Sequence, residues 1–213
     1  MYKRQVFAVG TKDACPPIPG LDKVKYVQAT ALLENPELMG DAEKIVVAGG
    51  GVVGCETAYW LTYEHSKKVS VVEMLPNFME GVCTANRGHL LHYMEKAGVE
   101  LYNCSKVKSF EPGKVNIQRN VSKGVPNPYN TWQPLLPENI PNPLAKKPGP
   151  ETQDVALDAD LVVLAMGGRP DDALYYEALS ENTAPEMFNI GDSFAGGKVL
   201  EATRAAFRLA REI

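Results

Sequence analysis

A group of closely spaced glycines is the part of the sequence whose residue types and spacing could do chemistry. Gly49, Gly51 and Gly54 have the spacing G-x-G-x-x-G. Between a strand and a helix, the first glycine permits a tight turn, the second lets a diphosphate approach the backbone, and the third allows close helix–sheet packing. The unpaired N–H groups and the dipole of the following helix also favour a diphosphate. The expected binding residues of this turn are Gly49, Gly50, Gly51, Val52, Val53 and Gly54.

An acidic residue further along the chain predicts which coenzyme this turn would hold. Glu73 follows Gly49 by 24 positions, directly after the apolar residues 69–72. A carboxylate there can accept hydrogen bonds from both hydroxyls of an adenosine ribose and repels a 2′-phosphate, which favours NADH over NADPH. The alternative is a glycine-rich turn in an unrelated α/β domain, because the glycine spacing alone is not specific.

The segments around the glycines have the order of elements that positions such a turn. Apolar residues 45–48 predict a strand before the glycines, and residues 51–64 predict the helix after them. A second helix is expected at 86–97, and short strand-like runs between 106 and 118 predict an antiparallel meander. The fold class expected is therefore α/β, with a Rossmann-like three-layer dinucleotide-binding domain and an antiparallel β-meander.

The second half of the chain begins with a segment that has no regular pattern. Residues 119–150 are rich in proline and asparagine, which predicts an irregular loop, either a surface excursion or a contact with another domain. Trp132, Leu135 and Leu136 are expected to hold this loop locally. Beyond it, residues 200–213 predict an amphipathic helix whose inner side carries Leu200, Ala206, Phe207 and Ala210.

Composition excludes several classes of function. The net charge of −4 argues against a nucleic-acid-binding face, and no apolar run approaches the roughly 20 residues that cross a membrane. We therefore expect neither nucleic acid nor membrane as a partner, and a cytoplasmic location. The four cysteines form no C-x-x-C pair, so no metal site is expected; Cys83 with His89 and His92 lacks the spacing of a ligand set.

Five stretches together resemble the two-dinucleotide-binding-domain flavoproteins. Within them the chain is most similar to the C-terminal half of the NADH:flavin oxidoreductases related to 2,4-dienoyl-CoA reductase and enoate reductase. The stretches are AVGTKDACPPIPG (8–20), VVAGGGVVGCETAYWL (46–61), VSVVEMLPNF (69–78), LVVLAMGGRPDDALYYEAL (161–179) and IGDSFAGGKVLEATRAAFRLAREI (190–213). They cover most of the chain apart from residues 105–160.

The resemblance implies that a nicotinamide-binding domain is inserted into an incomplete FAD-binding domain. The implied division is 1–40 and 169–213 for the partial FAD-binding domain and 41–168 for the NAD(H)-binding domain. The cofactor-binding residues expected outside the glycine-rich turn are Gly10, Gly167 and Asp192. The stretch around Gly10 resembles the crossover out of the FAD domain, and Asp192 resembles an aspartate that contacts the FAD ribityl chain. Asp192 as an ordinary turn residue is the alternative.

The resemblance also implies that the chain is part of a larger protein with further domains and cofactors. Members carry an N-terminal barrel with FMN and an iron–sulfur cluster, which reduces an activated C=C bond with electrons from NADH through FAD. The barrel, the cluster cysteines and the first FAD glycine motif are not in this chain, so we expect an N-terminally truncated C-terminal part. Its partners would be the missing flavin and barrel domains. The alternative is a non-catalytic ADP-binding or structural domain, as in amine dehydrogenases of this architecture.

No catalytic residue is expected in this chain. Hydride transfer requires two stacked rings at close distance and takes no acid or base from the protein. Glu56, just inside the first helix, resembles a family position near the nicotinamide. It is equally explained as an acid that the positive end of the helix dipole stabilises.

Overall fold

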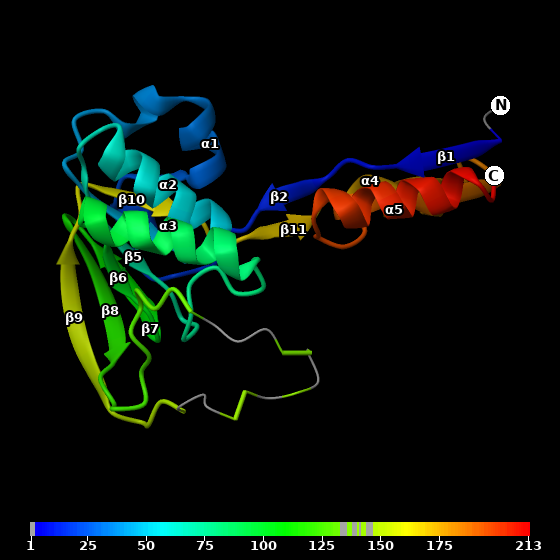
Figure 1. Ribbon diagram of the computed structural model, residues 1–213. Helices are drawn as coiled ribbons and strands as arrows, with labels where there is room; N and C mark the ends of the chain where they lie inside the picture. Colours follow the sequence, from blue (N-terminus) through cyan, green and yellow to red (C-terminus); the bar gives the residue numbers. More distant parts are fainter. Residues whose placement is uncertain (1–2, 133–135, 138–139, 141, 144–146) are drawn as a thin grey trace. The chain divides into compact units, whose positions relative to one another are not determined.

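The computed structural model describes residues 3–132, 136–137, 140, 142–143 and 147–213 (Figure 1). The chain forms two compact units, one made of Cys15–Met166 and the other of Met1–Ala14 with Gly167–Ile213. Each unit has its own strands and helices.

A five-stranded parallel sheet forms the centre of the Cys15–Met166 unit, with the strand order β3-β10-β4-β5-β6. Val46 of β4 pairs with Ser70 of β5 and with Val162 of β10. The carboxyl ends of these three neighbouring strands therefore lie along one edge of the sheet. The strands are β3 (Tyr26–Gln28), β4 (Lys44–Ala48), β5 (Lys68–Val72), β6 (Glu100–Tyr102) and β10 (Leu161–Leu164).

Helices cover one face of this sheet (Figure 1). Ile45 and Val47 of β4 point to this face, since alternate side chains of a strand lie on opposite faces. They pack with Leu61 of α2 and Leu91 of α3 in one hydrophobic cluster. The helices are α1 (Ala29–Glu34), η2 (Pro36–Met39), α2 (Val52–Tyr63) and α3 (Thr84–Ala97).

A three-stranded antiparallel meander covers the other face. Val46 and Ala48 of β4 point this way and pack in a second cluster with Phe110 and Ile117 of the meander. The meander consists of β7 (Ser105–Glu111), β8 (Lys114–Asn120) and β9 (Thr152–Asp158). Because both faces of β4 are buried, its residues form a continuous apolar run. The expected α/β class with three layers and an antiparallel meander is confirmed.

The N-terminal part of this unit includes residues before position 40, while the expected domain division at residue 40 stays a prediction. The compact unit begins at Cys15, because β3 pairs with β10 and adds a strand to the parallel sheet. The residues after β3 form two short helical elements, α1 and η2, with a break between them. Asn35 is extended at this break and its side chain accepts a hydrogen bond from Glu37 N, while Pro36 begins the next turn.

The segment between β8 and β9, residues 121–151, is called the excursion below. Its two ends are tied together, because Val121 N donates to Glu151 O at 2.9 Å and Asn120 Nδ2 donates to Gly149 O at 2.7 Å. Trp132 and Leu136 are exposed, so they do not hold the excursion in place as expected. Leu135 lies outside the described residues.

The second unit contains two strand pairs and two helices. β1 (Arg4–Phe7) pairs in parallel with β12 (Glu186–Asn189), and β2 (Thr11–Asp13) pairs in antiparallel fashion with β11 (Gly168–Pro170). The helices are α4 (Ala173–Glu181), η3 (Gly191–Ser193) and α5 (Val199–Ala210). Among the described residues of this unit, the buried hydrophobic ones are Ala178, Ala184 and Leu209.

The face of α5 that packs is not the expected one. Leu200 and Phe207 are 52% and 67% exposed, whereas Leu209 is buried and Ala202 and Ala205 are partly buried. The helical period was predicted correctly, but α5 packs against η3, with Ala202 next to Gly191, and leaves Leu200 and Phe207 in solvent. Throughout the part of the chain that the structure describes, no helix combines the length and apolar character that a membrane span requires.

Candidate dinucleotide-binding site

Two glycines of the turn between β4 and α2 are required by the packing of the chain itself. Gly49 has a φ of +112°, and a Cβ there would lie 2.3 Å from Ala165 O. A Cβ at Gly54 would lie 2.0 Å from Gly49 O, so the first turn of α2 can approach the end of β4 only without a side chain. These two positions form the tight turn and the close helix–sheet contact that the spacing predicts.

Gly51 has a different environment. Its φ is −69°, which any residue adopts, and a Cβ built there meets nothing within 4 Å. Neither the backbone conformation nor the packing of the chain requires a glycine at this position. Gly51 is the N-cap of α2, which has neither a side-chain cap nor an acidic residue in its first turn. The first N–H groups of a helix have no partner within the helix, and the positive end of the helix dipole lies there. This arrangement fits a diphosphate.

The structure brings Glu73 to the same turn. Its Oε2 accepts a hydrogen bond from Gly50 N at 2.7 Å, and its Oε1 accepts one from Leu75 N at 2.8 Å. Two backbone amides therefore fix the carboxylate directly after β5. Each oxygen keeps a further acceptor position, so both can still accept a hydrogen bond from a ribose hydroxyl.

The loop from β5 to α3, residues 74–83, packs against the glycine-rich turn at Gly50. Phe78 is fully buried, and a Cβ at Gly50 would lie 2.4 Å from its ring. Met79, in a left-handed conformation with φ of +52°, donates from its N–H to Gly50 O at 2.8 Å. Sequence reasoning missed Phe78 because a single aromatic residue in a proline-containing loop has no periodic signal.

Two buried polar groups lie behind the glycines. Cys55 Sγ contacts Gly50 O at 3.4 Å, and burial, with a smaller effect from the charge of Glu73, raises the pKa of this thiol to about 12. Arg87 of α3 is 2% exposed and donates from Nε to Phe78 O at 2.8 Å and from Nη1 to Asn130 O at 3.0 Å. Burial lowers the pKa of this guanidinium. Sequence reasoning missed Arg87, since a charged residue in an amphipathic helix normally faces solvent.

The remaining expected cofactor-binding residues lie in the other unit. Gly10 and Gly167 have φ values of +82° and +83°, and a Cβ at either meets nothing within 4 Å. Gly10 O accepts from Asp171 N at 3.0 Å, so the left-handed turn is held by the backbone. Asp192 lies in η3 and its Oδ1 accepts from Gly197 N at 3.1 Å. Their role towards a flavin stays a prediction. Glu56 is exposed in the second turn of α2.

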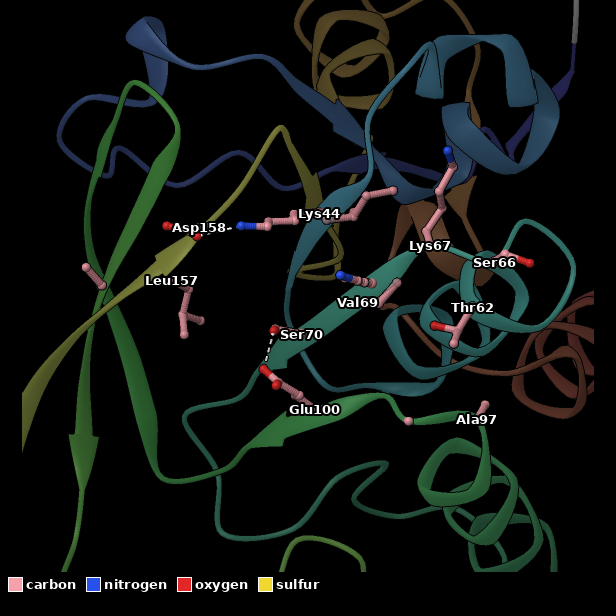
Figure 2. A pocket seen from close by; sticks show the side chains of 14 residues that line it. Lys44, Thr62, Ser66, Lys67, Val69, Ser70, Ala97, Glu100, Leu157 and Asp158 are labelled. Atoms are coloured by element: carbon pink, nitrogen blue, oxygen red, sulfur yellow. Dashed lines mark hydrogen bonds and ion pairs between the residues drawn. The ribbon is translucent and has the colours of Figure 1, made fainter.

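A groove of about 650 Å³ lies at the opposite, amino-terminal edge of the parallel sheet (Figure 2). Two of its charged groups form an ion pair, since Lys44 Nζ lies 2.6 Å from Asp158 Oδ2, and Glu100 Oε2 accepts a hydrogen bond from Ser70 Oγ at 2.9 Å (Figure 2). Lys67 at the same edge forms an ion pair with Glu43. We interpret this groove as structural, because Lys44 and Lys67 are already ion-paired and the groove lies at the edge of the sheet opposite to the glycine-rich turn.

Known proteins share this sequence pattern. Residues 1–188 match the family model of the pyridine nucleotide-disulphide oxidoreductases. An NADH oxidase from Thermoanaerobacter brockii is 28% identical over 98% of this chain and 27% of its own length. A cinnamate reductase from Clostridium sporogenes is 26% identical over 98% of this chain and 26% of its own length. The chain therefore spans only about a quarter of the relatives that it matches.

Solved structures share the fold. A 2-naphthoyl-CoA reductase, solved with 2-naphthoyl-CoA, superimposes with a TM-score of 0.75 at 25% identity, over 99% of this chain and 27% of that protein. Histamine dehydrogenase from Rhizobium sp. 4-9 superimposes with a TM-score of 0.74 at 16% identity, over 100% of this chain and 29% of that protein. The second likeness shows a common fold alone.

Proposed function

The chain belongs to the pyridine nucleotide-disulphide oxidoreductase family, and on this basis we propose that it is the NADH-binding portion of a flavin-dependent oxidoreductase. The observation that carries the proposal is the contrast within the glycine-rich turn. The packing of the chain requires Gly49 and Gly54, whereas Gly51 has open space where a diphosphate would lie. The requirements of the fold alone do not explain why position 51 is a glycine, whereas contact with a diphosphate does.

Each side of the turn has a separate task in this proposal. The first N–H groups of α2 hold the diphosphate, and Glu73, fixed by Gly50 N and Leu75 N, accepts hydrogen bonds from the adenosine ribose. NADH supplies a hydride when bound, and a flavin is the group that takes it. We assign no catalytic acid or base to the chain, because positioning alone serves this reaction.

The wider activity is also part of the proposal. Gly10, Gly167 and Asp192 would contribute to an FAD site that further protein segments complete. The electrons would continue through an iron–sulfur cluster and FMN in a barrel domain to an activated C=C bond. A cinnamate reductase and a 2-naphthoyl-CoA reductase among the similar proteins support an acceptor of this class.

The binding part of the proposal can be tested on the chain itself. NADH, NADPH and ADP are titrated separately into the 213-residue protein, and dissociation constants are measured by calorimetry. We expect NADH to bind more tightly than NADPH. Glu73→Ala should weaken NADH binding by about 10-fold to 100-fold, the effect of losing hydrogen bonds to a charged acceptor, and should narrow the difference from NADPH.

Glu100→Ala is the matched control, because Glu100 lies on the neighbouring strand β6 at the opposite edge of the sheet. It should leave both dissociation constants unchanged. Absence of binding by NADH and ADP at millimolar concentration would refute the nucleotide function. Tight ADP binding, with no reduction of bound flavin by NADH in the whole protein, would instead support the non-catalytic alternative.

A further inference from the structure

Two buried side chains bridge the same two segments of the chain. Arg87 donates to Phe78 O in the β5–α3 loop and to Asn130 O in the excursion. Asn103 Nδ2 donates to Pro76 O in the same loop at 2.8 Å and to Pro126 O in the excursion at 2.9 Å. Both side chains are 2% exposed. Each side chain therefore joins the loop to the excursion by hydrogen bonds that are shielded from solvent.

The position of the β5–α3 loop determines the shape of the nucleotide turn. Through Phe78 and Met79 the loop contacts Gly50, and through Leu75 N it fixes Glu73. A displacement of this loop would release one of the two amides that hold the carboxylate. Arg87 acts on the loop at Phe78, the residue that packs under Gly50.

The excursion has its own attachment to the rest of the unit. Tyr129 OH donates to Val99 O at 2.7 Å, directly before β6. A Cβ at Gly88 of α3 would lie 3.0 Å from Thr131 O, so the excursion also runs close to α3. The part from Val121 to Trp132 is thus attached to the body of the unit, and the β5–α3 loop is connected to it through Arg87 and Asn103.

We infer that Arg87 and Asn103 are positioning residues of the coenzyme site, and that the excursion from Val121 to Trp132 is the support through which they set coenzyme affinity and choice. The inference rests on the proposed function, since it needs Glu73 to contact the ribose. The excursion is therefore part of the binding machinery, although it lies 48 positions or more after Glu73 in the sequence.

The rival explanation is that both side chains only stabilise the fold. The two explanations differ in what a substitution does to coenzyme discrimination. If the side chains only stabilise the fold, a substitution lowers the free energy of unfolding and leaves the ratio of the NADH and NADPH dissociation constants unchanged. A displaced Glu73 changes this ratio, because the carboxylate no longer opposes a 2′-phosphate at the same position.

The experiment uses Arg87→Met and Asn103→Leu in the full 213-residue chain. Asn103→Leu keeps the size of the side chain and removes both bridging hydrogen bonds, so it tests the inference even where Arg87→Met does not fold. Two quantities are measured: hydrogen exchange of peptides covering 74–83 and 121–132 without ligand, and the dissociation constants of NADH and NADPH. Asn116→Leu is the matched control, because it makes the same change of side chain and removes two hydrogen bonds, to Ser109 and Glu111, that lie within the meander and reach neither segment.

We expect Asn103→Leu to accelerate hydrogen exchange in both segments and to weaken NADH binding by about tenfold. The dissociation constants of NADH and NADPH should become more similar than in the unchanged chain. Asn116→Leu should leave exchange in 74–83 and 121–132 and the ratio of the NADH and NADPH dissociation constants unchanged. Wild-type exchange in 74–83 and a wild-type ratio in Asn103→Leu would overturn the inference. If the unchanged chain fails to bind NADH, the proposed function is wrong, while the exchange measurement still decides whether the two segments are coupled.

Discussion

At the scale of single residues, Gly51 and Gly54 separate ligand contact from packing. Gly51→Ala adds a Cβ to open space at an ordinary φ, so the unfolding free energy should change by no more than about 0.5 kcal/mol. The same methyl group would occupy the space of the diphosphate, so NADH affinity should fall by more than about tenfold. Gly54→Ala should instead destabilise the fold by about 1–3 kcal/mol, since its Cβ would lie 2.0 Å from Gly49 O.

Urea unfolding and NADH titration of both variants test this difference. Gly113→Ala is not a suitable control, because Gly113 has a φ of +76° and any side chain there is strained. Gly196→Ala is better matched, since a Cβ there meets nothing and Gly196 lies in the other unit. Equal NADH affinity of Gly51→Ala and the unchanged chain would place the diphosphate elsewhere.

Cys55 gives the fold a dependence on alkaline pH. Burial raises the pKa of its thiol from 9.0 to about 12. Between these values the unfolded chain loses the proton and the folded chain keeps it, so stability is complete below pH 9 and declines as pH rises. The expected slope is about 1.4 kcal/mol per pH unit.

Cys55→Ala removes this contribution while leaving the titrating tyrosines in place. The difference in unfolding free energy between the unchanged chain and the variant, measured by urea unfolding, should be constant below pH 9 and shrink from pH 9 to 12. A pH-independent difference would show that the thiol titrates alike in both states.

At the scale of elements, the sequence could predict the features whose residues follow one another closely in the chain. The strand, turn and helix around Gly49 and the acid at Glu73 follow one another within one βαβ unit, so local patterns sufficed. Arg87 contacts residues 9 and 43 positions away, and no local period encodes such pairs. β9 was also missed, because its side chains alternate weakly in burial and it follows an irregular segment.

The two faces of the parallel sheet should contribute differently to binding and to stability. Phe110 is fully buried in the cluster between sheet and meander, on the face opposite to α2. Phe110→Ala should destabilise the fold by about 3–5 kcal/mol and leave the NADH affinity of the folded protein within about twofold. Lys108→Ala, exposed on the same strand, should be nearly neutral in both measurements. A large loss of affinity in folded Phe110→Ala would show that the meander shapes the site.

At the scale of the whole molecule, the hydrophobic core is distributed unequally between the two units. Both hydrophobic clusters consist of residues from Cys15–Met166. In the other unit, among its described residues, burial is limited to small groups around Ala178, Ala184 and Leu209, while Phe194, Val199 and Phe207 are largely exposed. Apolar burial is the main favourable term in folding, so we expect most of the stability to reside in Cys15–Met166.

This inequality predicts that the core-rich unit is self-sufficient. Residues 15–166 produced alone should unfold within about 5 °C of the full chain and bind NADH within about twofold, because the glycine-rich turn, Glu73 and both clusters are retained. In the full chain, amide exchange in β1, β12 and α5 should be faster than in β4, β5 and β10. Thermal unfolding, NADH titration and exchange mass spectrometry measure the three quantities. An unfolded 15–166 fragment, or one that folds without binding NADH, would show that Met1–Ala14 and Gly167–Ile213 supply what the two clusters lack.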